Sequence, residues 1–259
     1  MQAMWQRKVQ IWWELFILLV QKELRVRYRG SSLGYLWSMM NPLLYMLILT
    51  FIFSHIVRFE VSNFPLFILS GIMTWNLFQQ SLAMGVHSIV TNGALLRKVR
   101  VPAAVFPAAC IGSVLVNFSL SFLPFFFIAL YMHHPLGLAI LFLPFVLIPF
   151  LAFIYGATLV VASLNVKFRD IGHVIEPILM LVFYATPILY PREALPEVYR
   201  PFLNCNPMVF FVTVMRDLLL NNRLPAFSDM LVVYILAACM LAIGLKVYTR
   251  LRPRFIFDL

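Results

Sequence analysis

Residues 103–132 read AAVFPAACIGSVLVNFSLSFLPFFFIALYM, and no Asp, Glu, Lys or Arg interrupts them. A helix of about 20 apolar residues crosses the hydrocarbon core of a bilayer, so this stretch predicts a membrane-spanning helix. The whole chain agrees, because 63% of its 259 residues are hydrophobic and only 12% are charged. Soluble domains average about 45–50% and about 25%. The composition therefore excludes an ordinary soluble globular protein, a disordered chain and a disulfide scaffold.

Five other apolar stretches have the same character. Together with the first they predict an all-α polytopic membrane protein, with six transmembrane helices at 33–57, 64–90, 103–132, 136–164, 174–189 and 230–248. Pro144 and Pro149 are expected to break the fourth span, because proline removes a helical hydrogen bond and clashes with the preceding turn. The fifth span is short, with Pro177 and Pro187 near its ends.

The N-terminal segment has a different pattern. No short apolar core precedes a small-residue cleavage site, so no signal peptide is expected. Residues 5–26 instead form an amphipathic pattern, with Glu14 and Gln21 on a polar stripe and Leu18 and Leu19 opposite, which suits the membrane interface. The alternative is a first transmembrane span, which the polar groups make costly. We expect 1–32 to be a cytoplasmic interface helix with a basic linker, and 33–259 to be the six-span domain.

A long connection at 190–229 separates the last two expected spans. Asn206 and Pro207 begin a helix-like stretch that reaches Leu220. Because this stretch carries Arg216 and Asp217, it is too short and too charged to cross the membrane. We expect a re-entrant helical hairpin in the outer leaflet, where the rest of the protein shields its backbone.

The charges divide between the two sides that these spans define. The net charge is +10, and fifteen of the 20 basic residues fall in the segments on the side of the two termini. Cytoplasmic connections of membrane proteins are enriched in Lys and Arg, so both termini are expected in the cytoplasm. Basic residues next to span ends orient the chain and contact lipid headgroups, which removes the reason to expect nucleic acid as a partner.

Residues that would carry catalysis or ion coupling are scarce. The chain has no phosphate-binding loop of the form G-x-x-x-x-G-K-[ST], no H-E-x-x-H motif and no G-x-S-x-G motif. His133 and His134 are adjacent and face different ways on a helix, and the three Cys lack metal-binding spacing, so no metal site is expected. Glu176 is the one carboxylate near an apolar zone, and we expect it to pair with Arg169 or His173.

Three local patterns point to a family. The first is RYRGSSLGYLW at 27–37 with NPLL at 41–44, and the second is GIMTWNLF at 71–78 with NGALLRKVRVP at 92–102. The third is LNVKFRD at 164–170, TPILYP at 186–191 and RDLL at 216–219. In this combination and order the chain resembles the ABC type-2 permease family, and within it the exporters of O-antigen, capsule and teichoic acid. Thr186 stands where the family pattern has Ser, which is a mild chemical change.

The resemblance implies a transport subunit and not an enzyme. It implies a homodimer in the bacterial cytoplasmic (inner) membrane, with ATP and Mg²⁺ held by separate ABC nucleotide-binding subunits and no cofactor in this chain. The cargo that it implies is a polyprenyl-diphosphate-linked glycan of the O-antigen type used in lipopolysaccharide. Export of another lipid or of a drug is the first alternative, and an ion-coupled carrier is the second.

The resemblance also assigns roles at the cytoplasmic side. Segment 91–102 is implied to be a coupling helix that contacts the ATPase. The implied contacts are Asn92, Leu95, Arg97, Lys98 and Arg100, the last four of them expected to be exposed. Three arginines next to the first span are implied to attract the lipid diphosphate, and they are Arg25, Arg27 and Arg29.

Further roles follow along the path that the resemblance implies for the glycan. Aromatic side chains on the spans implied to face the channel are expected to contact sugar rings. They are Tyr35, Trp37, Tyr45, Phe51, Trp75, Phe78, Phe183, Tyr184 and Tyr190. The hairpin at 190–229 is expected to form an outer gate that includes Asn206 and Arg216.

Overall fold

The computed structural model describes residues 2–52, 63–99, 101–135 and 137–259, and within these ranges it is helical and contains no strand. The long helices are α1 (Gln2–Tyr28), α3 (Phe64–Thr91), α5 (Val105–Tyr131), α6 (Leu143–Lys167) and α10 (Phe227–Leu251). The shorter ones are α2 (Leu36–Ile52), α4 (Gly93–Lys98), α7 (Ile171–Tyr184), α8 (Arg200–Leu203), α9 (Pro207–Leu219) and α11 (Phe255–Asp258). Single 3₁₀ turns lie at Leu138–Phe142, Arg192–Ala194, Glu197–Tyr199 and Arg252–Arg254.

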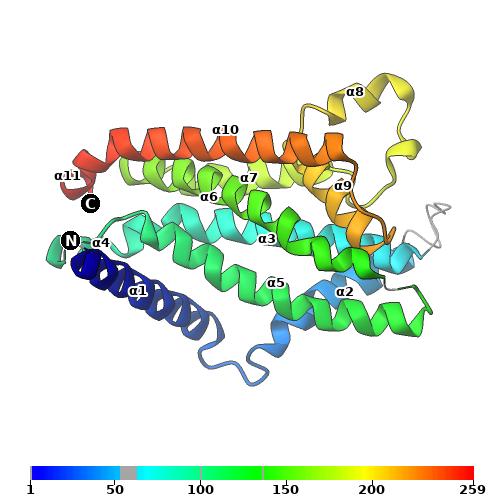
Figure 1. Ribbon diagram of the computed structural model, residues 1–259, viewed down its shortest axis with the longest axis horizontal. Helices are drawn as coiled ribbons and strands as arrows, with labels where there is room; N and C mark the ends of the chain where they lie inside the picture. The colour runs from blue at the N-terminus through cyan, green and yellow to red at the C-terminus, as the bar shows by residue number, and fades with distance from the viewer. Residues whose placement is uncertain (1, 53–62, 100, 136) are drawn as a thin grey trace.

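The long helices form a bundle that runs along the longest axis of the molecule (Figure 1). Both termini and α4 lie at one end, which we call the terminal end, and α8 and α9 lie at the other, the distal end (Figure 1). α3 is the central helix and contacts α2, α5, α6, α7 and α9. α1 lies at an angle to the bundle and packs on α5.

Among the described residues, three segments are long and apolar enough to cross a membrane: Val105–Tyr131, Leu138–Lys167 and Phe227–Arg254. They correspond to the expected third, fourth and sixth spans. α2 and α7 are apolar but have only 17 and 14 residues. At 1.5 Å per residue they are about 25 Å and about 21 Å long, shorter than a hydrocarbon core of about 30 Å. α3 has 28 residues and carries a polar stripe, which is described below.

The expectation that prolines break the fourth span is wrong, because α6 is continuous from Leu143 to Lys167. Pro144 lies in the first turn, where the missing N–H would have no helical partner in any case. Pro149 lies inside the helix and leaves the carbonyl of Phe145 without its helical donor. The hydroxyl of Tyr234 on α10 donates to that carbonyl at 3.0 Å, so a neighbouring helix supplies the lost bond.

The pairing of α6 with α10 depends on two glycines. A Cβ at Gly156 would lie 2.4 Å from the main-chain oxygen of Met240, and a Cβ at Gly244 would lie 2.3 Å from that of Gly156. Backbones can approach this closely only where a side chain is absent. Next to this contact, Phe150 and Phe153 stack on Phe211 of α9, with ring centroids 4.7 and 5.0 Å apart.

α1 is amphipathic, but its apolar residues do not all face the same neighbour. Leu19 is 7% exposed and packs with Phe106 and Ala109 of α5. Leu18, which was expected on the same face, is 62% exposed, and Trp13 is exposed as well. One apolar side of α1 therefore packs against the protein, while another apolar side is exposed.

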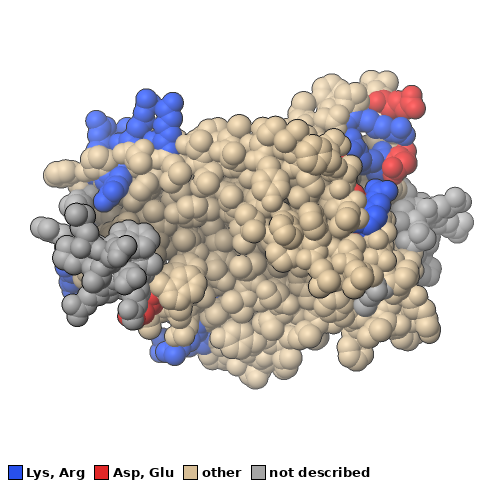
Figure 2. All heavy atoms as spheres, viewed as in Figure 1, with Lys and Arg blue, Asp and Glu red and all other residues tan. Residues whose placement is uncertain are grey.

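On the face that Figure 2 shows, the charged side chains gather toward the two ends of the bundle. A wide band without charged atoms separates a terminal end that is mostly basic from a distal end where basic and acidic side chains are mixed. Arg169 of the turn after α6 donates to the main-chain oxygen of Asp258 at 3.3 Å, so the turn and the C-terminus meet at the terminal end. The distribution matches the division of charges that the sequence predicts.

The 190–229 segment contains the helix predicted from Asn206-Pro207. α9 begins at Pro207 and ends at Leu219, and it packs against α3, α6 and α10. Asn206 caps its first turn, since its Oδ1 accepts from the N–H of Met208 at 3.0 Å.

Candidate functional site

The polar stripe on α3 is the feature around which the candidate site is built. Asn76, Gln79, Gln80 and Ala83 recur at spacings of three and four residues, so they share one side of the helix. α2 packs against α3, and a cavity lies on each side of it. Asn76 and Ala83 line both cavities, so the stripe connects them.

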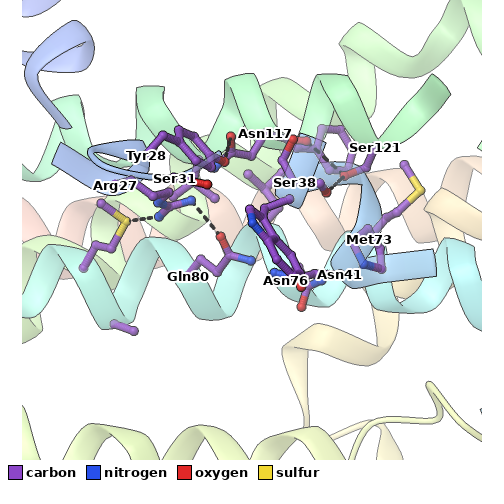
Figure 3. A pocket seen from close by; sticks show the side chains of 17 residues that line it. Arg27, Tyr28, Ser31, Ser38, Asn41, Met73, Asn76, Gln80, Asn117 and Ser121 are labelled. Carbon is purple, nitrogen blue, oxygen red and sulfur yellow. Dashed lines mark hydrogen bonds between the residues drawn. The ribbon is translucent and has the colours of Figure 1, made fainter. Parts of the chain in front are cut away.

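The first cavity, cavity 1, has a volume of about 560 Å³ and lies between the end of α1, α2, α3 and α5. Arg27 donates to Oε1 of Gln80 at 3.1 Å and also contacts the sulfur of Met84 (Figure 3). Tyr28 donates its hydroxyl to Oδ1 of Asn117 at 2.9 Å. The walls of this cavity combine neutral polar groups with apolar side chains such as Met73 and Phe118, and one guanidinium lies among them.

The second cavity, cavity 2, has a volume of about 410 Å³ and lies between α2, α3 and α7. Tyr45 of α2 and Phe183 and Tyr184 of α7 line it, together with Trp75 of the central helix. The Trp75 and Phe183 rings lie 5.4 Å apart. Cavity 2 thus combines aromatic faces with the amides of the stripe, a combination that suits sugar rings and their hydroxyl groups.

Glu176 also lines cavity 2, and the expectation that it pairs with Arg169 or His173 is wrong. Within the described ranges Glu176 forms no ion pair. Arg169 is directed instead at the main-chain oxygen of Asp258.

The structure places the other aromatic residues of the expected channel at different positions. Trp37 lines cavity 1, whereas Tyr35 lies beside it and stacks at 4.7 Å on Tyr28. Phe51 lies near the end of α2, and neither cavity includes it. Phe78 was expected on the channel, but it is buried and packs on Phe153.

Tyr190 follows α7 and donates its hydroxyl to the main-chain oxygen of Tyr184 at 3.0 Å. Burial raises the pKa of Tyr190, so the hydroxyl keeps the proton that this bond requires. Tyr190 therefore holds the end of α7 and is not itself part of the cavity wall.

The three arginines that were expected to attract the lipid diphosphate have different surroundings in the structure. Arg25 and Arg29 are exposed, while Arg27 is half-buried and lines cavity 1. Its partners Gln80 and Met84 lie eleven and seven residues before the end of α3, which is about 10–16 Å along the helix axis. Arg27 therefore lies well inside the bundle and not at its terminal rim.

The expected coupling residues lie on and beside α4 at the terminal end. Arg97 and Lys98 are exposed, and Arg100 lies outside the described residues. Leu95 is only half-buried in a cluster with Leu19 and Phe106, so the expectation of a fully exposed contact is wrong for it. Asn92 accepts from Nζ of Lys22 at 2.8 Å. α4 is thus attached to α1, as well as to the start of α5.

The two residues expected in the outer gate are bonded to the segment that follows α7. Asn206 donates to Oγ1 of Thr186 at 2.8 Å. Arg216 is buried and donates to the main-chain oxygens of Pro187 at 2.6 Å, Ile188 at 2.8 Å and Phe67 at 3.4 Å. Its guanidinium lies 3.6 Å from the ring centroid of Phe67. Both side chains hold the segment that follows α7 in place, and neither lines a described cavity.

Sequence reasoning missed two residues that line the cavities and one that supports them. Asn76 lies beside Gln79 and Gln80 on α3, Asn117 lies in the apolar α5, and Asn165 is buried between α3 and α7. Asn165 donates to the main-chain oxygen of Val86 at 2.9 Å and accepts from the N–H of Gly172 at 3.0 Å. The available signal was polar side chains within apolar helices, since such groups are costly to bury without partners.

In the part of the chain that the structure describes, no three His, Cys, Asp or Glu side chains are grouped so as to hold a metal ion. Cavities 1 and 2 offer hydrogen-bonding groups, aromatic faces, the guanidinium of Arg27 and the carboxylate of Glu176.

Comparisons with known proteins match the chain to transport proteins. The family model described as ABC-2 type transporter matches residues 14–220. The chain is 35% identical to the O-antigen export system permease protein RfbA of Myxococcus xanthus, over 93% of this chain and 94% of that protein. It is 30% identical to the protein of the same name from Klebsiella pneumoniae, with 93% of each chain covered. It is 25% identical to the polysialic acid transport protein KpsM of Escherichia coli, over 89% of this chain and 90% of that protein.

Proposed function

The chain belongs to the ABC-2 type transporter family, and from that premise we propose that it is the permease subunit of an ATP-driven exporter of lipid-linked polysaccharide. The relatives named for O-antigen export are 30–35% identical, and the relative named for polysialic acid transport is 25% identical. We therefore propose a polyprenyl-diphosphate-linked glycan of the O-antigen type as cargo.

One observation carries this proposal: the amide stripe of α3 is flanked by aromatic side chains of α2 and α7. Tyr45, Phe183 and Tyr184 surround cavity 2, and Asn76 and Gln79 supply hydrogen-bonding groups. Aromatic rings stack on the faces of sugars, while amides exchange hydrogen bonds with hydroxyl groups. A path of this composition lets a polar polymer pass through an apolar bundle.

The energy for transport is proposed to come from a partner ATPase that binds ATP and Mg²⁺. Arg97 and Lys98 on α4 are exposed and suit an acidic or polar groove on that partner. Because Lys22 bonds to Asn92 and Leu95 packs with Phe106 of α5, a force on α4 is applied to α1 as well as to α5.

The arrangement in the membrane is proposed to be six spans with both termini in the cytoplasm, and a homodimer with its channel between two copies. The mostly basic terminal end fits the cytoplasmic side of a bacterial inner membrane. α2 and α7 are too short to cross alone, so each depends on the neighbouring segments and on the second copy to complete its path.

The proposal is tested in the bacterium that makes this chain. Removing it should leave lipid-linked glycan at the cytoplasmic face of the inner membrane, and the wild-type chain should restore export. Export should stop when ATP is depleted, because the partner ATPase supplies the energy. Export that continues without ATP would support an ion-coupled carrier instead.

The partner contact has its own test. Reversing both charges on α4, with Arg97→Glu and Lys98→Glu, should weaken capture of the ATPase at least about tenfold, because like charges then face each other. The matched control is Lys246→Glu with Arg250→Glu, two exposed basic residues at the same end on α10. Equal capture by both variants would contradict the assignment of α4.

A further inference from the structure

Cavity 1 contains hydrogen-bonding groups that the protein itself leaves unused. The side-chain amides of Asn41 and Asn76 make no hydrogen bond to any described residue, and Figure 3 shows them next to each other on facing helices. The NH₂ group of Gln80 is also unpaired, since only its oxygen accepts from Arg27. Asn41 is exposed and Asn76 and Gln80 are half-buried, so their free amide groups are accessible to water or to a polar ligand.

The backbone adds an acceptor to the same wall. Pro42 lies inside α2 and has no N–H, so the carbonyl of Ser38 loses its helical donor. Only a long bond of 3.5 Å from the Ser121 hydroxyl replaces it. That carbonyl can therefore accept from a hydroxyl group placed in the cavity.

The single cation of cavity 1 has donors to spare. Arg27 carries five N–H groups, and its described partners are the Gln80 oxygen and the Met84 sulfur. A guanidinium with free donors binds a phosphate oxygen. The remaining walls are neutral and include the exposed indole of Trp37. The cavity thus offers one position for an anion and, beside it, a larger neutral part suited to a ring with several hydroxyl groups.

Its volume of about 560 Å³ lies within the range of about 300–1,000 Å³ typical of small-molecule sites, so it holds one or two sugar rings and not a polymer. We propose that cavity 1 is a binding site for the first sugar of a lipid-linked glycan, with the adjoining phosphate on Arg27. This inference rests on the proposed function, and it assigns the sugar nearest the lipid to cavity 1, which adjoins cavity 2 and shares Asn76 with it.

The test compares two probes on the purified permease–ATPase complex in lipid nanodiscs: undecaprenyl diphosphate, and undecaprenyl diphosphate carrying one hexose or N-acetylhexosamine. Native mass spectrometry reports the affinity for each. The wild type should bind one of the sugar-bearing lipids about tenfold more tightly than the bare lipid, which is the effect of two or three neutral hydrogen bonds. Asn41→Leu with Asn76→Leu should remove that difference and leave binding of the bare lipid unchanged.

Two further variants complete the experiment. Arg27→Gln should weaken both lipids to a similar extent, because it removes the contact with the phosphate. Ser119→Leu is the matched control on an exposed part of α5 outside the cavity, and it should bind as the wild type does. Asn41 and Asn76 have no partners to lose, so their replacement breaks no described hydrogen bond.

The possible outcomes distinguish a failure of the cavity 1 proposal from a failure of the proposed exporter function. If the wild type binds both lipids equally, or if the double Asn variant keeps the preference for the sugar, cavity 1 is not a sugar site while the exporter function stands. If the wild type binds neither lipid, both the site and the lipid-linked cargo are contradicted.

Discussion

α7 and α9 are helices of nearly equal length, with 14 and 13 residues, yet they are packed in opposite ways. In α9 ten residues are buried, and these include the charged Arg216 and Asp217. In α7 only Gly172, Ile175 and Leu179 are buried, and apolar side chains such as Leu181 stay exposed. Hydrophobicity alone therefore does not decide which of these helices the protein covers.

The difference shows how each helix is held. Arg216 of α9 donates to three main-chain oxygens, and Asp217 accepts from Arg223 at 2.7 Å and from Asn221 at 2.9 Å. α7 packs on α3 with Ile175 and Leu179 in the core, and polar contacts hold its two ends, through Asn165 before it and through Arg216 after it. Its exposed face is left for lipid or for a second copy of the chain, and this is the helix that lines cavity 2.

The largest effect is expected at the distal attachment of α7. Arg216→Ala would leave the carbonyls of Pro187 and Ile188 without donors, whereas that of Phe67 keeps the Ser70 hydroxyl. An unpaired buried group costs about 1–3 kcal/mol, so we expect a loss of at least about 2 kcal/mol and a drop in melting temperature of at least about 4 °C in detergent. The control is Arg192→Ala, which removes an exposed bond to Asn204. Equal melting of the two variants would show that Arg216 does not hold this end.

A smaller effect is expected at the terminal attachment. Asn165→Leu removes the bonds to Val86 and Gly172, with an expected cost of about 1–3 kcal/mol. Hydrogen exchange should increase in the first turn of α7, because the N–H of Gly172 loses its acceptor. Thr249→Val on exposed α10 serves as the control. Unchanged exchange at residues 171–175 would mean that packing against Ile175 is sufficient to fix this end.

Substitutions on the exposed face of α7 should cost almost no stability. The measurement for this face is therefore cross-linking between two copies of the chain. With Cys205 and Cys239 replaced by Ser, a cysteine introduced at Leu181 should cross-link two copies in membranes. A cysteine at Ile235, which is exposed on α10, should not. The opposite pattern would place α10 and not α7 at the interface between copies.

Part of this comparison was predictable from the sequence. Asn206-Pro207 predicted the start of α9, because an Asn cap followed by proline specifies a first turn, and the apolar spans predicted α5, α6 and α10. Whether a helix is covered depends on residues distant in the chain. The burial of Arg216 requires Gly71, where a Cβ would lie 2.8 Å from the guanidinium.

The types of residue at the site could be predicted from the sequence, but their positions along the bundle could not. The arginine cluster at 25–29 was expected at the membrane border, but only the contact of Arg27 with Gln80 shows that it lies inside the bundle. Pro149 looked like a helix breaker until Tyr234 supplied the missing bond. In each case a partner more than 50 positions away decides the outcome, and local periodicity carries no information about it.

The central claim is that the glycan passes along the stripe of α3 between α2 and α7. Photo-cross-linking tests it most directly, with a benzophenone amino acid at Tyr45 or Tyr184 and, as the control, at Ile235 of α10, during export arrested by a non-hydrolysable ATP analogue. We predict that the positions lining cavity 2 capture glycan-bearing lipid, detected by a lectin or antibody against the sugar, and that Ile235 does not. Capture at Ile235 with none at Tyr45 and Tyr184 would contradict the account.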